Sequence, residues 1–310
     1  MTVLVFDVGG TRLKAGLAAP SGIASLTALP TEVASADALV AQMTGVGRQL
    51  LGGERPSAIG VSIKGIVESE RGLLVDVNAP LDPLSGEPLG ERLAEAFEAP
   101  VYVENDARMH ALGEFHRGAG RGSENLVCLT LGTGIGVGVV IDGQLIRGKR
   151  GVLGILAGHI TVDVDGPPCT CGNVGCLEAL IGTNGLVADA QARALDHPGS
   201  RLSRKALDPE AIFAAAAEGD EAATATVKRF THILGCGVVS LIHVYDPEIV
   251  VIGGGLSASA PHFLNDVQRF ADQHAWTQPK GRVRIAASRL GDTAALVGAA
   301  ELANRSCKTA

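Results

Sequence analysis

The sequence predicts an α/β fold arranged in two lobes, and three observations lead to this. The chain has 310 residues, 46% of them hydrophobic, which is enough for a core larger than that of a single lobe. Short apolar strands occur in clusters with helical stretches between them, as in α/β proteins. A strand–glycine–strand unit at residues 2–18 recurs in the same form at residues 127–141.

The first lobe is expected to span residues 1–117. Alternation of apolar residues followed by a glycine turn predicts a β-hairpin at its start, and a proline- and glycine-rich stretch predicts a loop further on. The expected elements are a hairpin at 2–18, a helix at 36–52, a buried strand at 58–63, a loop at 79–91, a short strand at 100–104 and a helix at 107–117.

The second and larger lobe is expected to span residues 118–293 and to carry a cysteine-rich loop, while a C-terminal helix at about 294–310 packs back on the first lobe. Its strands are short apolar runs, and its one long apolar stretch has the length of a core helix. The expected elements are strands at 127–131 and 137–141, a helix at 221–245 and a strand with a glycine turn at 249–257.

The charge and the N-terminus restrict the class of protein. The net charge is −7 and no run of Lys or Arg occurs, which disfavours nucleic acid and anionic membranes as partners. No basic residues precede the first apolar run, so we expect no signal peptide and a cytoplasmic protein. The uncharged stretch 125–141 is divided by four glycines into strand-sized pieces. Structural disulfides are disfavoured in that reducing compartment.

Three glycine turns, each after an apolar strand, suggest a nucleotide site. Glycine lets backbone N–H groups approach phosphate oxygens without a Cβ in the way. The turns are Asp7-Val8-Gly9-Gly10-Thr11, Gly132-Thr133-Gly134 and Gly253-Gly254-Gly255. The carboxylate of Asp7 and the hydroxyl of Thr11 suit a hydrated Mg²⁺ and phosphate. A structural hairpin is the better explanation of any one of these turns alone, and it is the three together, each after an apolar strand, that favour a nucleotide site.

The cysteine cluster suggests a metal site. Cys169, Cys171 and Cys176 lie within eight residues in a glycine-bearing segment, and His159 lies ten residues upstream. One histidine and three thiolates complete a closed, structural Zn²⁺ site. Free thiols or a redox pair are the alternatives. Cys128 and Cys236 lie in apolar elements and are expected in the core.

Asp106 follows a predicted strand and opens a predicted helix. Either Asn105 or Asp106 suits the N-cap of that helix. The other interpretation makes Asp106 a general base that accepts the proton of an attacking hydroxyl. The residues alone leave both interpretations open.

Together these motifs resemble the ROK family of repressors and sugar kinases. The resemblance covers nearly the whole chain, and the histidine-plus-cysteine stretch is its most specific part. It is carried by residues 7–11, Glu104-Asn105-Asp106-Ala107, residues 131–136, Gly158-His159, residues 169–178 and residues 246–257.

The resemblance implies a two-lobed actin/hexokinase-like fold, with ribonuclease-H-like lobes around a central cleft. It implies ATP-dependent phosphorylation of a hexose or hexose derivative, Mg²⁺ with the ATP, one structural Zn²⁺ per chain and a homodimer or homotetramer. Asp106 would be the catalytic base. The substrate-binding residues would be Gly65, Asn78, Asn105, Asp106, His159 and Glu178. The nucleotide-binding residues would be Asp7, Gly9, Gly10, Thr11, Lys14, Gly132, Thr133, Gly134, Gly253, Gly254, Gly255 and Leu256.

Two positions depart from the family pattern. Family kinases usually carry Glu three residues before the zinc histidine, where this chain has Leu156, and proline or a small residue where it has Lys64. We therefore expect a sugar other than plain glucose. A non-catalytic or regulatory sugar-binding protein is the alternative. Asp7 lies six residues from the start, which leaves no room for a helix-turn-helix domain ahead of it.

Overall fold

The structure is a computed structural model and describes residues 2–203 and 207–309; residue 310, in the predicted C-terminal helix, lies outside them. The chain forms two compact units. The first contains residues 1–122, 144–155 and 292–310, and the second contains residues 123–143 and 156–291. These limits differ from the predicted lobes at 118–122, 144–155 and 292–293, which all belong to the first unit.

The first unit is built on a five-stranded sheet of order β3-β2-β1-β4-β7. β1 pairs with β2 in an antiparallel hairpin, as predicted, and β1, β4 and β7 are parallel. In their register Val8 lies opposite Ile63, and Ile63 lies opposite Asn105. The carboxyl ends of the three strands therefore meet at one edge of the sheet. The strands are β1 (Val3–Val8), β2 (Arg12–Ala19), β3 (Gly22–Pro30), β4 (Ala58–Ile63) and β7 (Val101–Asn105), with a separate pair β5 (Ile66–Glu68) and β6 (Leu73–Asp76). The two-residue β10 (Gln144–Leu145) belongs to the other five-stranded sheet, of order β10-β9-β8-β11-β12.

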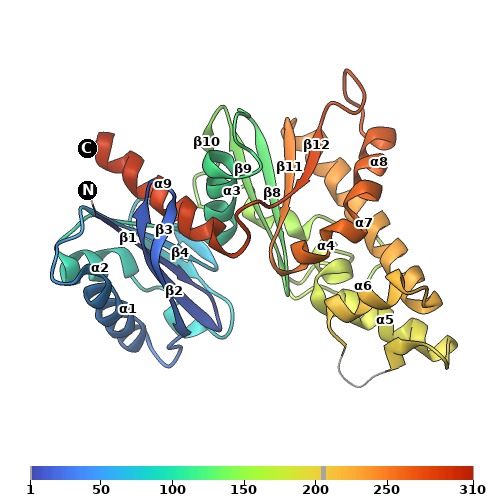
Figure 1. Cartoon of the computed structure of the whole chain (residues 1–310), viewed down its shortest axis with the longest axis horizontal. Coiled ribbons are helices and arrows are strands. Elements are labelled where there is room, and N and C mark those ends of the chain that lie inside the picture. Colours follow the sequence, from blue (N-terminus) through green and yellow to red (C-terminus); the bar gives the residue numbers. More distant parts are fainter. Residues whose placement is uncertain (1, 204–206, 310) are drawn as a thin grey trace. The chain divides into compact units, whose positions relative to one another are not determined.

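Helices cover both faces of this sheet because successive side chains of a strand point to opposite faces. Leu4 and Phe6 pack in the cluster that holds α1 (Ala36–Leu51) and α2 (Leu89–Phe97). Val3 and Val5 pack instead with α3 (Asp106–Arg117) and α9 (Ala294–Thr309). Figure 1 shows α1 and α9 on opposite sides of the β1–β4 strands.

Local signals in the sequence set the ends of these helices. The Ser35 hydroxyl accepts a hydrogen bond from the Ala38 N–H at the start of α1, and Gly52 ends the helix with a left-handed φ of 59°. The predicted loop at 79–91 needs a correction, because a short 3₁₀ turn occupies Asp82–Leu84 and α2 begins at Leu89. The buried Leu89, Leu93 and Phe97 recur at helical spacing and favour the helix there.

The second unit repeats the hairpin-plus-parallel-strand design. β8 and β9 form the predicted antiparallel hairpin, and β8, β11 and β12 are parallel. Gly253, the last residue of β11, lies opposite Thr130, so the turns after β8 and β11 share one edge of this sheet. The elements are β8 (Leu126–Leu131), β9 (Ile135–Ile141), β11 (Ile249–Gly253), β12 (Arg284–Ala287), α4 (Leu177–Ile181), α5 (Thr183–Asp196), α6 (Pro209–Ala217), α7 (Glu221–Tyr245) and α8 (Leu264–His274).

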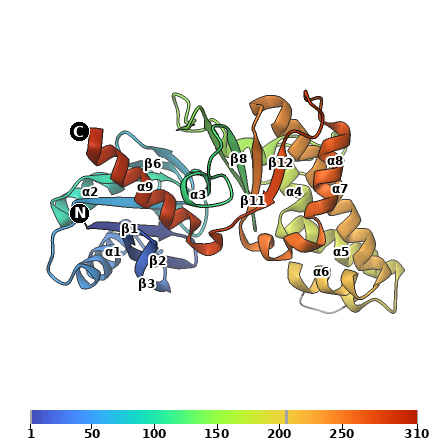
Figure 2. The same cartoon turned by 45° about the horizontal axis from the view of Figure 1, so that its top comes forward.

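The long helix α7 is the core helix of the second unit, as predicted. Asp220 caps its first turn by accepting from the Ala223 N–H at 3.0 Å, and Figure 2 shows α7 and α8 side by side near β12. By length and composition α7 is the one helix in the described part of the chain that could span a membrane, and half of its most apolar stretch is buried in the protein. Cys236 on α7 is only half-buried, so its predicted place in the core is wrong, whereas Cys128 is buried as expected.

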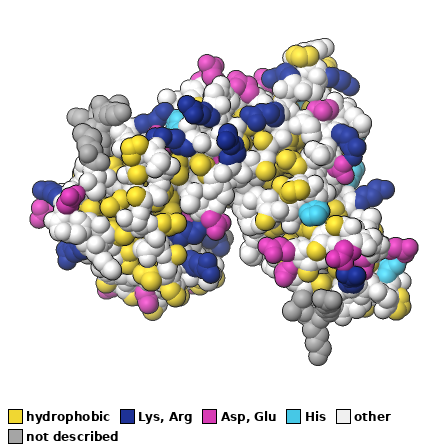
Figure 3. All heavy atoms as spheres, viewed as in Figure 1, with side chains coloured by type: hydrophobic (Ala, Val, Ile, Leu, Met, Phe, Trp, Pro, Cys, Tyr) yellow, Lys and Arg dark blue, Asp and Glu magenta, His cyan; other side chains and the backbone are white. Residues whose placement is uncertain are grey.

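The surface of the first unit carries some exposed hydrophobic side chains. Figure 3 shows them where β2 and β3 lie, and the exposed large hydrophobic residues of β3 are Leu26 and Leu29. β3 is an edge strand of the sheet, and most of its residues are exposed or half-buried. Its sequence therefore lacks the run of buried apolar residues that predicts a strand, and the predicted elements did not include it.

Candidate active site

Two carboxylates stand at the carboxyl edge of the first sheet. Asp7 is the penultimate residue of β1, and Asp106 directly follows β7. The Ser62 hydroxyl on β4 donates to Asp7 Oδ1 at 2.8 Å, and Lys14 Nζ lies 3.9 Å from Asp7 Oδ2. In open α/β sheets, ligands bind at the carboxyl ends of the strands, which is where this pair lies.

Asn105, not Asp106, caps helix α3. The Asn105 Oδ1 accepts from the Arg108 N–H at 3.2 Å, and its Nδ2 donates to the Gly65 carbonyl at 2.9 Å and to Asp106 Oδ1 at 3.0 Å. The Ala107 N–H also donates to Asp106 Oδ1, at 2.9 Å. No other residue that the structure describes donates a hydrogen bond to Asp106 Oδ2. The interpretation of Asp106 as a mere cap is therefore wrong, and one of its oxygens is free for a ligand.

The pKa of Asp106 is raised to about 6, first by burial and then by the charge of Asp7. The Ala107 N–H and the Lys64 ammonium lower the pKa and limit the rise. Burial also raises the pKa of Asp7, against the hydrogen bond from Ser62 and the charge of Lys14. Burial and a neighbouring like charge both disfavour the ionised carboxylate and so raise its pKa. A carboxylate with a pKa near 6 is still ionised at neutral pH and is basic enough to accept a proton.

The predicted residues Gly10, Gly65 and Asn78 meet around one loop. A Cβ on Gly65, whose φ is 114°, would lie 2.3 Å from a methyl of Val77, and one on Gly10 would lie 2.7 Å from the Pro80 ring. Residues 77–80 thus pack against both turns, and Asn78 is exposed between them. The Gly9 N–H donates to the Arg12 carbonyl, as in a tight hairpin, and Thr11 is exposed.

A buried ionic cluster supports Asn105 and Asp106 from behind. Each oxygen of the fully buried Glu104 carboxylate accepts two hydrogen bonds. Oε1 accepts from the Asn105 N–H at 2.8 Å and from Arg108 Nη1 at 3.1 Å. Oε2 accepts from the Ser69 hydroxyl at 2.8 Å and from Arg147 Nε at 2.6 Å. The cluster fixes the turn from β7 into α3.

Arg108 also ties a distant segment to that turn. Its Nη2 donates to the backbone carbonyls of Arg147 and Leu153, at 3.1 and 2.8 Å, which draws residues 147–153 into the first unit. Sequence reasoning missed this cluster. The available signal was a Glu at the end of a strand with an Arg four residues later, a spacing that places the two side chains together on a helical turn.

The two glycine turns of the second unit lie next to each other. The Gly132 N–H donates to the Gly134 carbonyl at 3.0 Å. A Cβ on Gly254, whose φ is 81°, would lie 2.4 Å from the Leu131 carbonyl oxygen, so only glycine fits there. Space is open around Gly255. Leu256 is buried, so any contact it makes with a nucleotide is through its backbone.

Glu178 and His159 lie beside the Gly132–Gly134 turn. Glu178 Oε2 accepts from the Ile135 N–H at 2.8 Å, and a Cβ on Gly134 would lie 2.8 Å from the same oxygen. Glu178 Oε1 lies 3.9 Å from His159 Nδ1. The second unit therefore brings its predicted nucleotide-binding turn, its predicted sugar-binding carboxylate and the cysteine cluster to one place.

The four predicted metal ligands form one cluster. The ligand atoms of His159, Cys169, Cys171 and Cys176 all lie within 4.8 Å of one another. Cys169 Sγ is 3.5 Å from His159 Nδ1, and Cys171 Sγ is 3.7 Å from Cys176 Sγ. In a tetrahedral Zn²⁺ site with Zn–S near 2.3 Å and Zn–N near 2.0 Å, ligand atoms are about 3.5–3.8 Å apart. The donor set and its spacing fit zinc.

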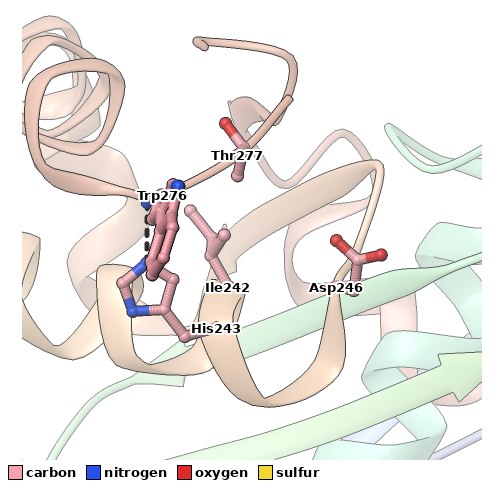
Figure 4. Close-up of a pocket in the computed structure, with 5 residues that line it drawn as sticks. All are labelled: Ile242, His243, Asp246, Trp276 and Thr277. Carbon is pink, nitrogen blue, oxygen red and sulfur yellow. Dashed lines mark hydrogen bonds between the residues drawn. The ribbon is translucent and has the colours of Figure 1, made fainter. Parts of the chain in front are cut away.

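A separate pocket of about 310 Å³ lies at the C-terminal end of α7. Figure 4 shows its lining of Ile242, His243, Asp246, Trp276 and Thr277. The backbone N–H of Trp276 donates to His243 Nε2 at 2.8 Å. The Trp276 residue is 89% exposed. This lining contains none of the predicted site residues.

Comparison with known proteins identifies the family. The model of the ROK family matches residues 3–306. A glucokinase of Thermotoga maritima is 32% identical over 303 residues, covering 96% of this chain and 95% of that protein. A xylose repressor of Caldicellulosiruptor bescii is 31% identical over 244 residues, which cover 77% of this chain but 60% of the repressor.

Solved structures agree with this match. A ROK hexokinase from Thermus thermophilus superposes with a TM-score of 0.84 at 32% identity, covering both chains fully. A ROK family glucokinase from Streptomyces griseus, solved with glucose and AMPPNP, gives 0.83 at 30% identity, covering 98% of this chain and all of the other. The fold is the actin/hexokinase-like fold of ROK sugar kinases. The chain belongs to the ROK family.

The metal cluster gives the first test. We expect about one Zn²⁺ per purified chain, because the four ligands make one closed site. Cys171→Ser should lose most of the metal and weaken sugar binding more than nucleotide binding. Cys236→Ser is the matched control, since this thiol lies on α7 outside the cluster and should leave the zinc content unchanged. Metal-free protein prepared without chelator would contradict the assignment.

Proposed function

We propose that this chain transfers the γ-phosphoryl group of ATP to a hydroxyl of a hexose or hexose derivative. It is a carbohydrate kinase by its full-length similarity to ROK glucokinases and hexokinases. The observation that carries the chemical role is Asp106, which has one free oxygen at the carboxyl edge of the sheet and a pKa of about 6.

Asp106 acts as the general base in this mechanism. The free oxygen Oδ2 accepts the proton of the sugar hydroxyl as that hydroxyl attacks the γ-phosphorus, while Oδ1 stays bound to the Ala107 N–H and Asn105 Nδ2. The two hydrogen bonds fix the carboxylate, so that proton transfer needs no reorientation. Asn105 and Gly65, joined by a hydrogen bond at 2.9 Å, form the wall beside the reacting hydroxyl.

The remaining predicted residues take supporting roles in the proposal. The Asp7 carboxylate and the Thr11 hydroxyl would hold a hydrated Mg²⁺, because Mg²⁺ prefers oxygen ligands, and the Lys14 ammonium would pair with phosphate oxygens. The turns at Gly132–Gly134 and Gly253–Gly255 bind the nucleotide through backbone groups.

The cysteine cluster and Glu178 serve the sugar. Glu178 would accept hydrogen bonds from sugar hydroxyls together with His159, which would also be a ligand of Zn²⁺. A metal held by all four side chains would shape this loop and would have no open position for chemistry.

A sugar-responsive regulator is less well supported. The glucokinase match extends over 95% of that relative, whereas the repressor match covers 60% of the repressor. The assay that separates kinase from non-catalytic binder is sugar-dependent ADP release against a panel of hexoses, hexosamines and deoxy sugars. No release above the sugar-free rate with any sugar would overturn the proposed function.

Asp106→Asn is expected to lower kcat by about 10² or more, since general-base catalysis contributes factors of 10²–10⁴. Binding of sugar and nucleotide should change little, because asparagine can still accept at the Oδ1 position. Asp142→Asn is the control, an exposed aspartate with a φ of 50° that asparagine tolerates. A folded Asp106→Asn variant with near-normal kcat would refute the role of the base.

Leu156 bears on which sugar is used. It is 47% exposed and lies on the 3₁₀ turn Ile155–His159, three residues before the proposed zinc ligand. A carboxylate at this position would accept hydrogen bonds from sugar hydroxyls. Leucine cannot accept them, so a hydroxyl desolvated beside it stays unpaired, which costs about 1–3 kcal/mol of binding free energy. We therefore propose that the preferred sugar has a deoxy, anhydro or apolar edge and that plain glucose is a poor substrate.

The glucokinase relatives make glucose the reference sugar of the test. Leu156→Glu should raise kcat/KM for glucose about 10-fold or more, because the new carboxylate would pair the sugar hydroxyl whose desolvation costs about 1–3 kcal/mol when it is unpaired. Leu153→Glu, at a similarly exposed leucine nearby in sequence, is the control. Wild-type kcat/KM for glucose above about 10⁴ M⁻¹s⁻¹, an ordinary enzyme efficiency, would contradict the proposal.

A further inference from the structure

Lys64 presents a cation beside the proposed base. It directly follows β4, whose last residue Ile63 lies opposite Asn105 in the parallel register, so Lys64 stands level with Asp106. The hydrogen bond from Asn105 Nδ2 to the Gly65 carbonyl holds the two turns together at this point. The Lys64 side chain is exposed.

The neighbouring cations are already engaged, and Lys64 is not. Lys14 lies 3.9 Å from both Asp7 and Asp292 and donates to the Asp292 carbonyl at 2.9 Å. Arg108 and Arg147 are bound to Glu104. Lys64 makes no ion pair or hydrogen bond with any residue that the structure describes, and its charge acts on Asp106 across the turn.

We propose that Lys64 is a catalytic residue that contacts the phosphoryl group during transfer. This inference rests on the proposed function. As the bond from the sugar oxygen to the γ-phosphorus forms, the bond from that phosphorus to the bridging oxygen breaks and its electron pair leaves with ADP. The hydroxyl proton passes to Asp106. The Lys64 ammonium keeps its proton and balances the negative charge on the phosphoryl oxygens.

The position favours the phosphoryl group over a remote part of the sugar. Asp106 must touch the attacking hydroxyl, and Lys64 lies level with Asp106 at the same edge of the sheet. A cation whose charge acts on Asp106 would lie close to the hydroxyl that Asp106 deprotonates, where the incoming phosphoryl group brings negative charge.

The charge of Lys64 also affects the base. Without it, burial and the charge of Asp7 would raise the pKa of Asp106 further, because Lys64 opposes both. Because catalysis needs ionised Asp106, a variant without the Lys64 charge would lose activity on acidification at a higher pH than the wild type. Removal of Lys64 should therefore move the acid limb of the pH profile upward, which a purely structural residue would not do.

The test compares Lys64→Met with Lys64→Arg. Lys64→Met keeps an unbranched chain and removes the charge, and it should lower kcat about 10²-fold for every accepted sugar, with KM for the sugar within about twofold. Lys64→Arg should restore most of kcat and the wild-type pH profile. Lys280→Met, at an exposed lysine of the second unit, should behave as wild type.

A binding measurement gives a readout independent of turnover. By calorimetry, Lys64→Met should weaken binding of inorganic phosphate about 10-fold and leave unchanged the binding of the uncharged sugar that the wild type accepts in the panel assay. The phosphorylated product of that sugar should follow inorganic phosphate, because the cation recognises the phosphoryl group itself.

Two results would overturn the role of Lys64 while leaving the kinase intact. One is a Lys64→Met variant with wild-type kcat and pH profile. The other is a rise in KM confined to gluconate or glucuronate, which would make Lys64 a ligand for a carboxylate of the substrate. Absence of sugar-dependent ADP release from the wild type would instead refute the proposed function.

Discussion

The parallel register of β1, β4 and β7 is the constraint on which the first unit depends. It sets Val8, Ile63 and Asn105 side by side, so that the residues around them meet at one edge. Two acids, Asp7 and Asp106, share that edge. Burial, and then the charge of Asp7, raises the pKa of Asp106 to about 6. This rise is useful for a base, but it lowers the stability of the folded protein progressively as the pH rises from the ordinary aspartate pKa of about 3.9 through 6, because the folded protein then holds a poorly solvated charge.

Behind this edge lies a third acid, whose charge is balanced by neighbouring cations. Glu104 is fully buried directly behind Asn105, yet its charge is balanced by Arg108 and Arg147 and four donors satisfy its oxygens. Buried charges are tolerated only with such complete pairing. Because these contacts lock the β7–α3 turn, the caps and hydrogen bonds that orient Asp106 need not be reorganised when a substrate binds.

Much of this could be predicted from the sequence where local chemistry determines structure. The hairpins, the glycine turns and the four clustered metal ligands depend on residues close in sequence, as does α7 with its Asp220 cap. What was missed depends on distant contacts. β12 is a four-residue strand defined by its pairing with β11. The role of Glu104 depends on its ion pair with Arg147, which lies 43 residues further along the chain. Which of Asn105 and Asp106 caps α3 required the hydrogen bonds themselves.

The most direct test of the central claim is the titration of Asp106 itself. Carboxyl carbons of ¹³C-aspartate-labelled protein can be followed by NMR between pH 3 and 8, with Asp106→Asn used to assign the signal. We expect a carboxyl signal that titrates with an apparent pKa of about 6 and is absent from the variant. A pKa for Asp106 at or below the ordinary aspartate value of about 3.9 would contradict it.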